Sequence, residues 1–249
     1  MNAIFKPVPH KLTVEAYYDL ARTGHLDEDD RVELIDGVII EMAPIGSDHV
    51  TAVNRLNRAF VLAVGDAGVV SVQNTVTLPP YSAPQPDIAV LAPRFRAFGE
   101  GLPRAEDILL VVEVADTTLA WDRRTKMPLY ARHGVREAWI VDLRARRIEV
   151  YREPAGAGYR HRSVHGPAET LRPLLLPGVG LLLVLQVHAE HIHLGLVPEL
   201  SAGQPLVEHL LLGLVTELSV RLVHVEHVHL RLITKLRPGQ TLVEVLLLS

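Results

Sequence analysis

Apolar residues recur along the first two thirds of the chain with two spacings, one helical and one strand-like. The helical spacing predicts α-helices over 13–23, 47–67 and 122–133. Alternating or continuous apolar runs predict strands over 69–73, 75–78, 87–91, 108–115, 136–143 and 147–152, the first two forming a strand pair. Within 31–42, Asp36-Gly37 separates two apolar runs and predicts a tight hairpin. Together these elements predict an α/β fold in which helices flank one mixed central sheet.

The segment after residue 170 has a different composition. It lacks Asp, Asn, Met and all aromatic residues, and it is rich in Leu and His. Residues 188–212 align without gaps to residues 224–248, which gives two repeats 36 residues apart. We therefore divide the chain into a domain over 1–180 and a Leu/His-rich repeat tail over 181–249. The tail is interpreted either as the product of a shifted reading frame outside the functional domain or as a genuine two-copy appendage.

Composition excludes several classes of protein. The chain has no cysteine, so it has neither disulfides nor thiolate metal sites, which fits a cytoplasmic location. Charged residues or Pro and Gly interrupt each long apolar stretch, so no membrane span is expected. The net charge of −4 argues against a nonspecific polybasic nucleic-acid binder. Residues 121–162, however, carry eleven Lys and Arg against five Asp and Glu, a balance that suits either a phosphate-handling site or a solvated surface.

Acidic residues at strand ends are the candidate site for chemistry. Asp87 opens one predicted strand, and Glu113 lies near the end of the next. Such carboxylates can converge on Mg²⁺, which prefers a few carboxylate oxygens and keeps several waters. In the following helix, Asp122, Lys126 and Tyr130 are four residues apart and share one face, from which the lysine could reach a phosphate. Taken singly, each of these residues has a simple structural explanation as a turn residue, a surface acid or a surface ion pair.

At these residues the sequence resembles the Uma-type restriction endonucleases of the PD-(D/E)xK nuclease superfamily. The resemblance covers about 12–180 and is carried by RVELIDGVIIEM, the helix with His49, QPDIAVL, ILLVVEVADTT, DRRTKMPLYARHGVREAWIVD and RRIEVYR. It implies a restriction-endonuclease-like sheet and Mg²⁺- or Mn²⁺-dependent hydrolysis of nucleic acid, with DNA as the expected substrate. A homodimer is considered because cutting both strands of a duplex needs two sites.

The resemblance also implies roles for individual residues. Asp87 and Glu113, with the backbone carbonyl of Val114, would hold the metal ion, and Lys126 would act on the phosphate. Where the superfamily pattern expects a lysine two residues after Glu113, this chain has Ala115, so the lysine is supplied from the next helix. The supporting residues that the resemblance implies are Glu33, His49, Asp122 and Tyr130.

Two other functions stay open at this point. A nuclease-like fold can serve as a nucleic-acid-binding or scaffolding module without turnover, because fold does not determine function. Alternatively, the His-x-x-His-x-His pattern of the tail could hold Zn²⁺. This pattern occurs twice, at His188, His191 and His193 and again at His224, His227 and His229. Strand alternation would place His188 on the face opposite the other two, which argues against the zinc interpretation.

Overall fold

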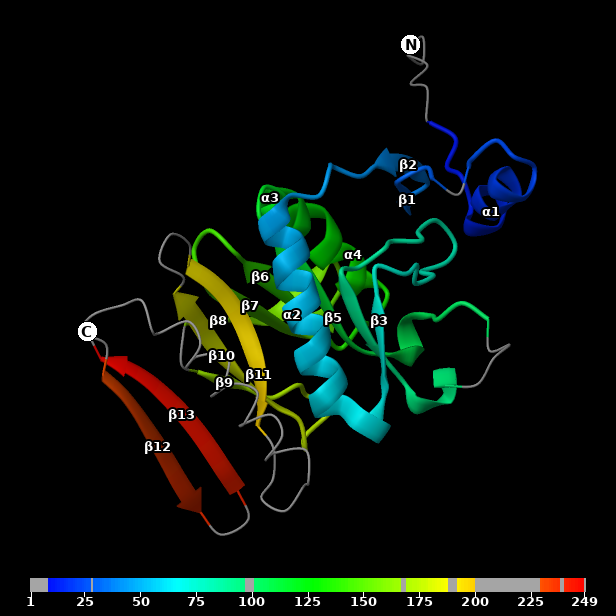
Figure 1. Ribbon diagram of the computed structural model, residues 1–249. Coiled ribbons are helices and arrows are strands. Elements are labelled where there is room, and N and C mark those ends of the chain that lie inside the picture. Colours follow the sequence, from blue (N-terminus) through cyan, green and yellow to red (C-terminus); the bar gives the residue numbers. More distant parts are fainter. Residues whose placement is uncertain are drawn as a thin grey trace, which may run out of the picture.

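The computed structural model describes residues 9–27, 29–96, 101–166, 169–187, 192–199, 229–237 and 240–248. Its centre is a six-stranded mixed sheet with the order β3-β4-β5-β6-β7-β8 (Figure 1). β5 and β6 run parallel, and the other neighbouring strands run antiparallel. The strands are β3 (Val69–Val72), β4 (Ile88–Leu91), β5 (Ile108–Ala115), β6 (Glu137–Asp142), β7 (Arg147–Ala155) and β8 (Gly158–His165). The predicted α/β fold around one mixed sheet is confirmed.

Helix α2 (Ser47–Val64) covers one face of this sheet and continues into the short 3₁₀ helix η1 (Gly65–Ala67). Its apolar stripe includes Val53, Leu56 and Phe60, and Phe60 lies 6.0 Å from Trp139 of β6, measured between ring centroids. The strand residues of this core alternate along β4 and β5, because successive side chains of a strand point to opposite faces.

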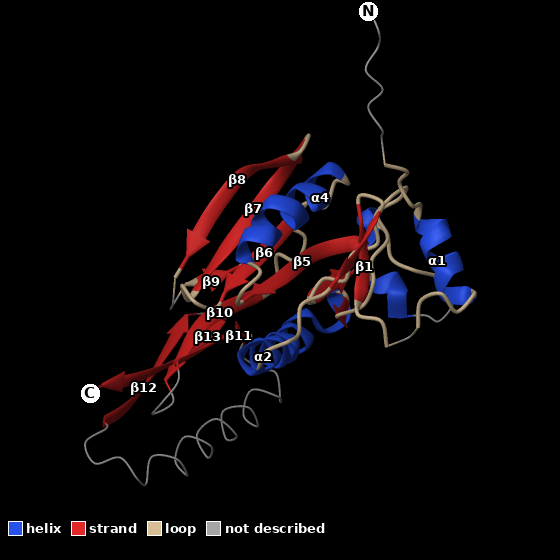
Figure 2. Ribbon diagram, turned by 90° about the horizontal axis from the view of Figure 1, so that it is seen from above, coloured by secondary structure: helices blue, strands red, loops and turns tan. Residues whose placement is uncertain are grey.

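The opposite face is covered by helix α4 (Met127–Arg132), which lies across the sheet from α2 (Figure 2). Before α4 come helix α3 (Leu119–Trp121) and the π-helical turn η4 (Asp122–Lys126). The predicted helix over 122–133 is therefore correct in position but is not a regular α-helix. Pro128 has no N–H and would clash with a carbonyl in a regular turn, so a wider turn precedes it. Gly134 ends the helix with a φ of 80°, as predicted.

A small N-terminal layer consists of helix α1 (Val14–Arg22) and the hairpin of β1 (Val32–Ile35) and β2 (Val38–Glu41). The hydroxyl of Thr13 accepts a hydrogen bond from the Ala16 N–H at 3.2 Å and begins α1. The hairpin turns at Asp36 and Gly37, whose φ angles of 50° and 84° are the left-handed pair expected of Asp-Gly.

The predicted strand pair of 69–73 with 75–78 is wrong. β3 pairs with β4, and residues 75–78 instead follow a loop path, with Thr77 donating to the Pro103 carbonyl at 2.7 Å and Leu78 to that of Ser82 at 2.8 Å. The short 3₁₀ helices η2 (Pro93–Arg96) and η3 (Ala105–Asp107) complete this region. Strand β8 was not expected, because as an edge strand it is largely exposed and has no apolar periodicity.

The first part of the tail contacts the rest of the fold. β10 (Gly180–Val187) pairs with β9 (Thr170–Leu171) and with β11 (Ile192–Glu199), which runs beside α2 (Figure 1). Leu181 is fully buried in the core under α2. Farther along, β12 (His229–Arg237) and β13 (Gln240–Leu248) form a separate hairpin. His188, His191, His224 and His227 lie outside the described residues, and the described helices include none long and apolar enough to cross a membrane.

Candidate active site

The carboxylate of Asp87 is held at the start of β4 by three donors. Val114 donates its backbone N–H to Oδ2 at 2.8 Å, and His49 Nε2 lies 3.1 Å from the same oxygen. Gln73 donates from its side-chain amide to Oδ1 at 3.2 Å. Burial alone would raise the pKa of Asp87, but these contacts lower it below its ordinary value, so the carboxylate is ionised. Its hydrogen bond in turn raises the pKa of His49.

Gln73 is a site residue that the sequence analysis missed. It follows β3 with a φ of 50°, a left-handed conformation that is uncommon for a residue other than glycine. The conformation is maintained from two sides by Asp87, because the Gln73 N–H also donates to the Asp87 carbonyl at 3.1 Å. The sequence offered one signal for Gln73, a polar Gln-Asn pair at the end of a strand. Such a pair is equally typical of an ordinary turn.

Glu113 lies next to Asp87 on the adjacent strand β5, but its surroundings are different. Tyr130 of α4 donates its hydroxyl to Glu113 Oε1 at 2.6 Å, and Lys126 Nζ lies 3.3 Å from the same oxygen. The side chain is 4% exposed. Burial raises the pKa of Glu113 to about 8, although the Lys126 ammonium opposes the shift. This carboxyl therefore needs additional positive charge to be ionised at neutral pH.

Lys126 connects the sheet to the N-terminal hairpin. Its Nζ lies 3.1 Å from Oε2 of Glu33, a buried residue of β1, as well as near Glu113. Burial lowers the pKa of Lys126, but Glu113 and Glu33 more than compensate, so the ammonium stays charged. The Gln85 backbone N–H also donates to Glu33 at 3.2 Å. The lysine was expected within reach of Asp87 and Glu113; its ion pairs are with Glu113 and Glu33, and Asp87 acts on it through charge.

Asp122 and Tyr130 lie on the buried side of η4 and α4 together with Lys126. Thr118 donates its hydroxyl to Asp122 Oδ2 at 2.8 Å, yet burial raises the pKa of Asp122 to about 6. Burial and the neighbouring Glu113 also raise the pKa of Tyr130 well above its ordinary value, so Tyr130 is a neutral donor. The π-helical turn changes the spacing of side chains but keeps all three on the face that meets the sheet.

Another buried carboxylate, which lies outside this cluster, fixes η4 to the sheet. Glu149 of β7 is fully buried and accepts hydrogen bonds from Arg123 of η4, Arg162 of β8 and the Tyr151 hydroxyl, the last at 2.6 Å. Burial raises its pKa, but the guanidinium groups prevail and lower it to about 2. Arg123 therefore ties the turn that carries Lys126 to the adjacent strands.

The site residues suit a divalent cation of the Mg²⁺ type. Four acidic side chains, Glu33, Asp87, Glu113 and Asp122, gather around the ammonium of Lys126, and burial raises the pKa of Glu113 despite that ammonium, so a bound cation would favour the ionised form of Glu113. Among the described residues no three Asp, Glu, His or Cys side chains enclose a metal position. Mg²⁺ does not need three, because it is commonly bound by one or two carboxylates and water.

The backbone carbonyl of Val114 also suits a role as a ligand of a divalent cation. Its N–H points toward Asp87. In an extended strand the N–H and C=O of one residue point to the same side, so the Val114 carbonyl faces the Asp87 side of β5. The paired part of β4 begins only at Ile88, opposite Val112. The carbonyl oxygen of Val114 therefore lies beyond the last paired residues of β4 and β5, on the side where it could share a cation with the Asp87 carboxylate.

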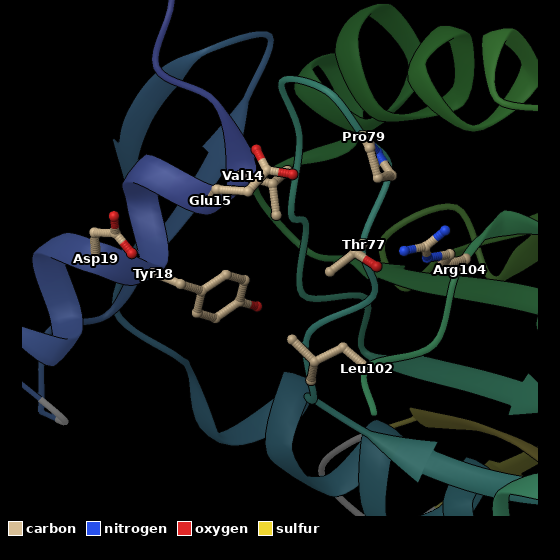
Figure 3. A pocket seen from close by; sticks show the side chains of 8 residues that line it. All are labelled: Val14, Glu15, Tyr18, Asp19, Thr77, Pro79, Leu102 and Arg104. Carbon is tan, nitrogen blue, oxygen red and sulfur yellow. The ribbon is translucent and has the colours of Figure 1, made fainter. Parts of the chain in front are cut away.

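A cavity of about 400 Å³ lies elsewhere, between α1 and the loops around Thr77 and Arg104 (Figure 3). Glu15 and Asp19 of α1 and Arg104 provide charged groups at its wall, and Leu102 an apolar one. The cavity shares no residue with the carboxylate cluster. The cavity is therefore separate from the candidate active site.

Comparison with known proteins agrees with the geometry. The chain is similar in structure to a crystal structure from Anabaena variabilis ATCC 29413 described as "a putative nuclease belonging to DUF820", with a TM-score of 0.51 and 17% sequence identity over 66% of this chain and 91% of the other. This likeness concerns the fold alone. None of the curated proteins matches the chain. Residues 14–186 match the sequence family described as "Uma2: Putative restriction endonuclease". This match spans most of the chain, and the chain therefore belongs to the Uma2 family of restriction-endonuclease-like proteins.

Proposed function

We propose that this chain is a metal-dependent endonuclease that hydrolyses phosphodiester bonds of DNA with Mg²⁺ or Mn²⁺. The observation that carries the proposal is the convergence of Asp87 and Glu113, from neighbouring strands, with the buried ammonium of Lys126. Membership in a family of restriction-endonuclease-like proteins supports a nucleic-acid substrate. Two acids and a charged lysine are the groups that phosphodiester hydrolysis at a metal site requires.

In this proposal Asp87, Glu113 and the carbonyl of Val114 hold the ion. When bound, Mg²⁺ supplies Lewis-acid stabilisation of the phosphate and lowers the pKa of a water molecule. Tyr130 orients Glu113 by donating to Oε1, which leaves Oε2 for the ion. His49 and Gln73 similarly fix the Asp87 carboxylate. Lys126 neutralises charge on the phosphoryl oxygens, and Glu33 holds the lysine in place.

The first prediction is that Asp87→Ala and Glu113→Ala each abolish metal-dependent cleavage of DNA. Losing one electrostatic contact of this kind commonly lowers the rate ~10²–10³-fold. Both variants should also weaken Mg²⁺ binding in calorimetry, and Glu113→Gln, which keeps the shape of the side chain, should behave likewise. Glu153→Ala, at an exposed ion pair with His161, is the matched control and should cleave normally. Cleavage at the parental rate by either alanine variant would mean that the site is misassigned.

A nucleic-acid-binding module without turnover is the second candidate. It is favoured by one observation: Lys126 already forms ion pairs with Glu113 and Glu33, so the cluster is partly satisfied without an ion. A titration with Mg²⁺ or Mn²⁺ separates the two functions, because a pure binding module would retain DNA without producing cuts at any metal concentration. Light scattering of the protein with duplex DNA tests for the homodimer that cutting both strands would require.

A further inference from the structure

Trp121 is exposed to an extent that is unusual for tryptophan. Its residue exposure is 38%, whereas Trp139, the other tryptophan of the chain, is fully buried. Tryptophan has the largest side chain and is highly buried on average, because exposing its apolar surface to water is unfavourable. An exposed indole next to a candidate active site suggests a surface that is covered when a ligand binds.

The packing of α3 does not depend on this side chain. Leu119, two residues earlier, packs against the core under α4, and the Trp121 N–H continues the helix by donating to the Thr118 carbonyl at 2.8 Å. Asp122, the next residue, points its carboxylate into the buried cluster. The short helix is thus anchored on its inner side, while Trp121 remains on the outer side.

Arg124 lies on the same exposed side as Trp121, because its side chain turns back toward the residue that precedes Trp121. It is exposed, and its Nε donates to the Ala120 carbonyl at 3.1 Å, which directs the guanidinium back along α3. The described residues include no carboxylate paired with it. An aromatic ring beside an unneutralised guanidinium is the combination that binds single strands, through base stacking and phosphate contact.

Two further exposed apolar residues lie at the same end of the sheet. Ile45 is 37% exposed and Val50 is 45% exposed, and they lie just before and within the first turn of α2. This end of α2 approaches the loop before α3, since a Cβ added to Gly46 would lie 3.9 Å from Asp116 Oδ2. The outer side of α3 therefore lies near the exposed apolar residues at the start of α2.

We propose that the outer surface formed by Trp121 and Arg124 binds single-stranded nucleic acid, with an unpaired base stacked on the indole and a phosphate at the guanidinium. The inference rests on the proposed function in that the same strand enters the carboxylate cluster. It names an unpaired strand as the substrate class. A paired duplex would not offer the face of a base, because its bases are stacked on one another.

The test uses the full chain in a chelator, so that binding is measured without cleavage. A short oligothymidylate should quench the emission of Trp121 and leave that of buried Trp139 unchanged. In fluorescence anisotropy with a labelled strand, Trp121→Ala should weaken binding about tenfold, and Trp121→Phe, which keeps an aromatic face, should stay within about twofold of the parent. Arg124→Ala should lower the dependence of log K on log salt concentration by ~0.7.

Two matched variants serve as controls. Tyr81→Ala removes an exposed aromatic ring elsewhere, and Arg160→Ala removes an exposed cation on β8; both should bind the strand as the parent does. Equal quenching by a duplex closed with hairpin ends, or tight binding without any quenching, would overturn the inference. Quenching without cleavage after metal addition would support it and count against the nuclease proposal, whereas cleavage without quenching would do the reverse.

Discussion

Each carboxylate of the candidate site has an ionisation state set by its neighbours. Asp87 receives three donors, and its pKa is lowered despite burial. Glu113, on the adjacent strand, is more deeply buried and has a raised pKa of about 8. The difference arises because the contacts of Asp87 with His49, Val114 and Gln73 outweigh its burial, whereas burial of Glu113 outweighs Lys126 and the Tyr130 hydroxyl. The two acids thus have different requirements for a cation although both are expected to bind it.

The shared lysine leads to the second prediction. Lys126→Met replaces the ammonium with an apolar chain of similar length and should lower the cleavage rate ~10²–10³-fold. Mg²⁺ affinity should stay the same or increase, because removing a positive charge leaves the carboxylates more negative. Lys126→Arg should not restore full activity, since the planar guanidinium is broader than the ammonium. Calorimetry and cleavage assays measure both quantities, and a fully active methionine variant would show that the lysine only stabilises the fold.

The third prediction concerns Glu149 and pH. Its pKa of about 2 in the folded protein is below the ordinary value of 4.5, so its ion pairs stabilise the fold fully above about pH 4.5 and are lost as pH falls toward 2. Glu149→Gln should lower the free energy of unfolding by about 1–3 kcal/mol at pH 7. Urea unfolding at pH 7 and at pH 3.5 should show a smaller difference between variant and parent at the lower pH. A difference that is independent of pH would contradict the assigned ion pairs.

At the scale of elements, the site depends on how the hairpin and the helix are joined. β1 carries Glu33 to Lys126, and Asp36 at the hairpin turn accepts two hydrogen bonds from Arg132 at the end of α4, each 2.9 Å. Gly37 allows this turn to lie against the chain before α1. A Cβ at Gly37 would lie 2.6 Å from Lys11 Cβ. The turn therefore positions both the hairpin and the acid that it carries.

The fourth prediction follows from this turn. Gly37→Ala should lower the free energy of unfolding by about 2–4 kcal/mol, because the left-handed backbone and the contact with Lys11 are both unfavourable for alanine. Gly134→Ala is a matched control, with a φ of 80° and no atom within 4 Å of the added Cβ. It should cost only about 1–2 kcal/mol. Equal losses in urea unfolding would show that close approach to Lys11 contributes nothing.

For the whole molecule, the main question is where the functional domain ends. The sequence places its limit at residue 180, but β10 begins there, pairs with β9 and buries Leu181. The family match likewise continues to residue 186. The first strands of the tail, β10 and β11, thus contact the domain of residues 1–180, and the division of the chain at residue 180 stays a prediction. Whether the later repeat is a shifted reading frame stays a prediction, which translation of the gene in its other two frames would test.

The fifth prediction is that truncation after Glu199, which keeps β10 and β11, leaves the fold and any cleavage activity intact. Truncation after Gly180 should be less stable by about 2–4 kcal/mol, because it removes the buried Leu181 and the strand partner of β9. Thermal unfolding of the two truncated proteins beside the full chain measures the difference. If the longer truncated protein also unfolds, the second repeat completes the core. If the shorter one is as stable as the full chain, the original limit at residue 180 is correct.

Sequence alone determined the elements whose signals are local. Apolar spacing predicted α1, α2 and the buried strands β4 to β7, because their periodicities reflect a single buried face or a fully buried run. Asp36-Gly37 and Gly134 predicted a turn and a helix end, since their left-handed φ angles are properties of the residue itself. The resemblance in residues 12–180 gave the family and indicated Asp87, Glu113 and Lys126 as the candidate site.

Only the tertiary structure decided the features that depend on contacts between distant segments. Gln73 joins Asp87 because β3 pairs with β4 rather than with residues 75–78, and no local signal distinguishes these partners. Lys126 pairs with Glu33 because the hairpin folds over α4. Edge strand β8 is exposed and has no apolar period to read. The pKa values of Asp87 and Glu113 were likewise decided by burial and by partners as far as 38 residues away in sequence, which is why residue type and spacing predicted members of the candidate site but not their charges.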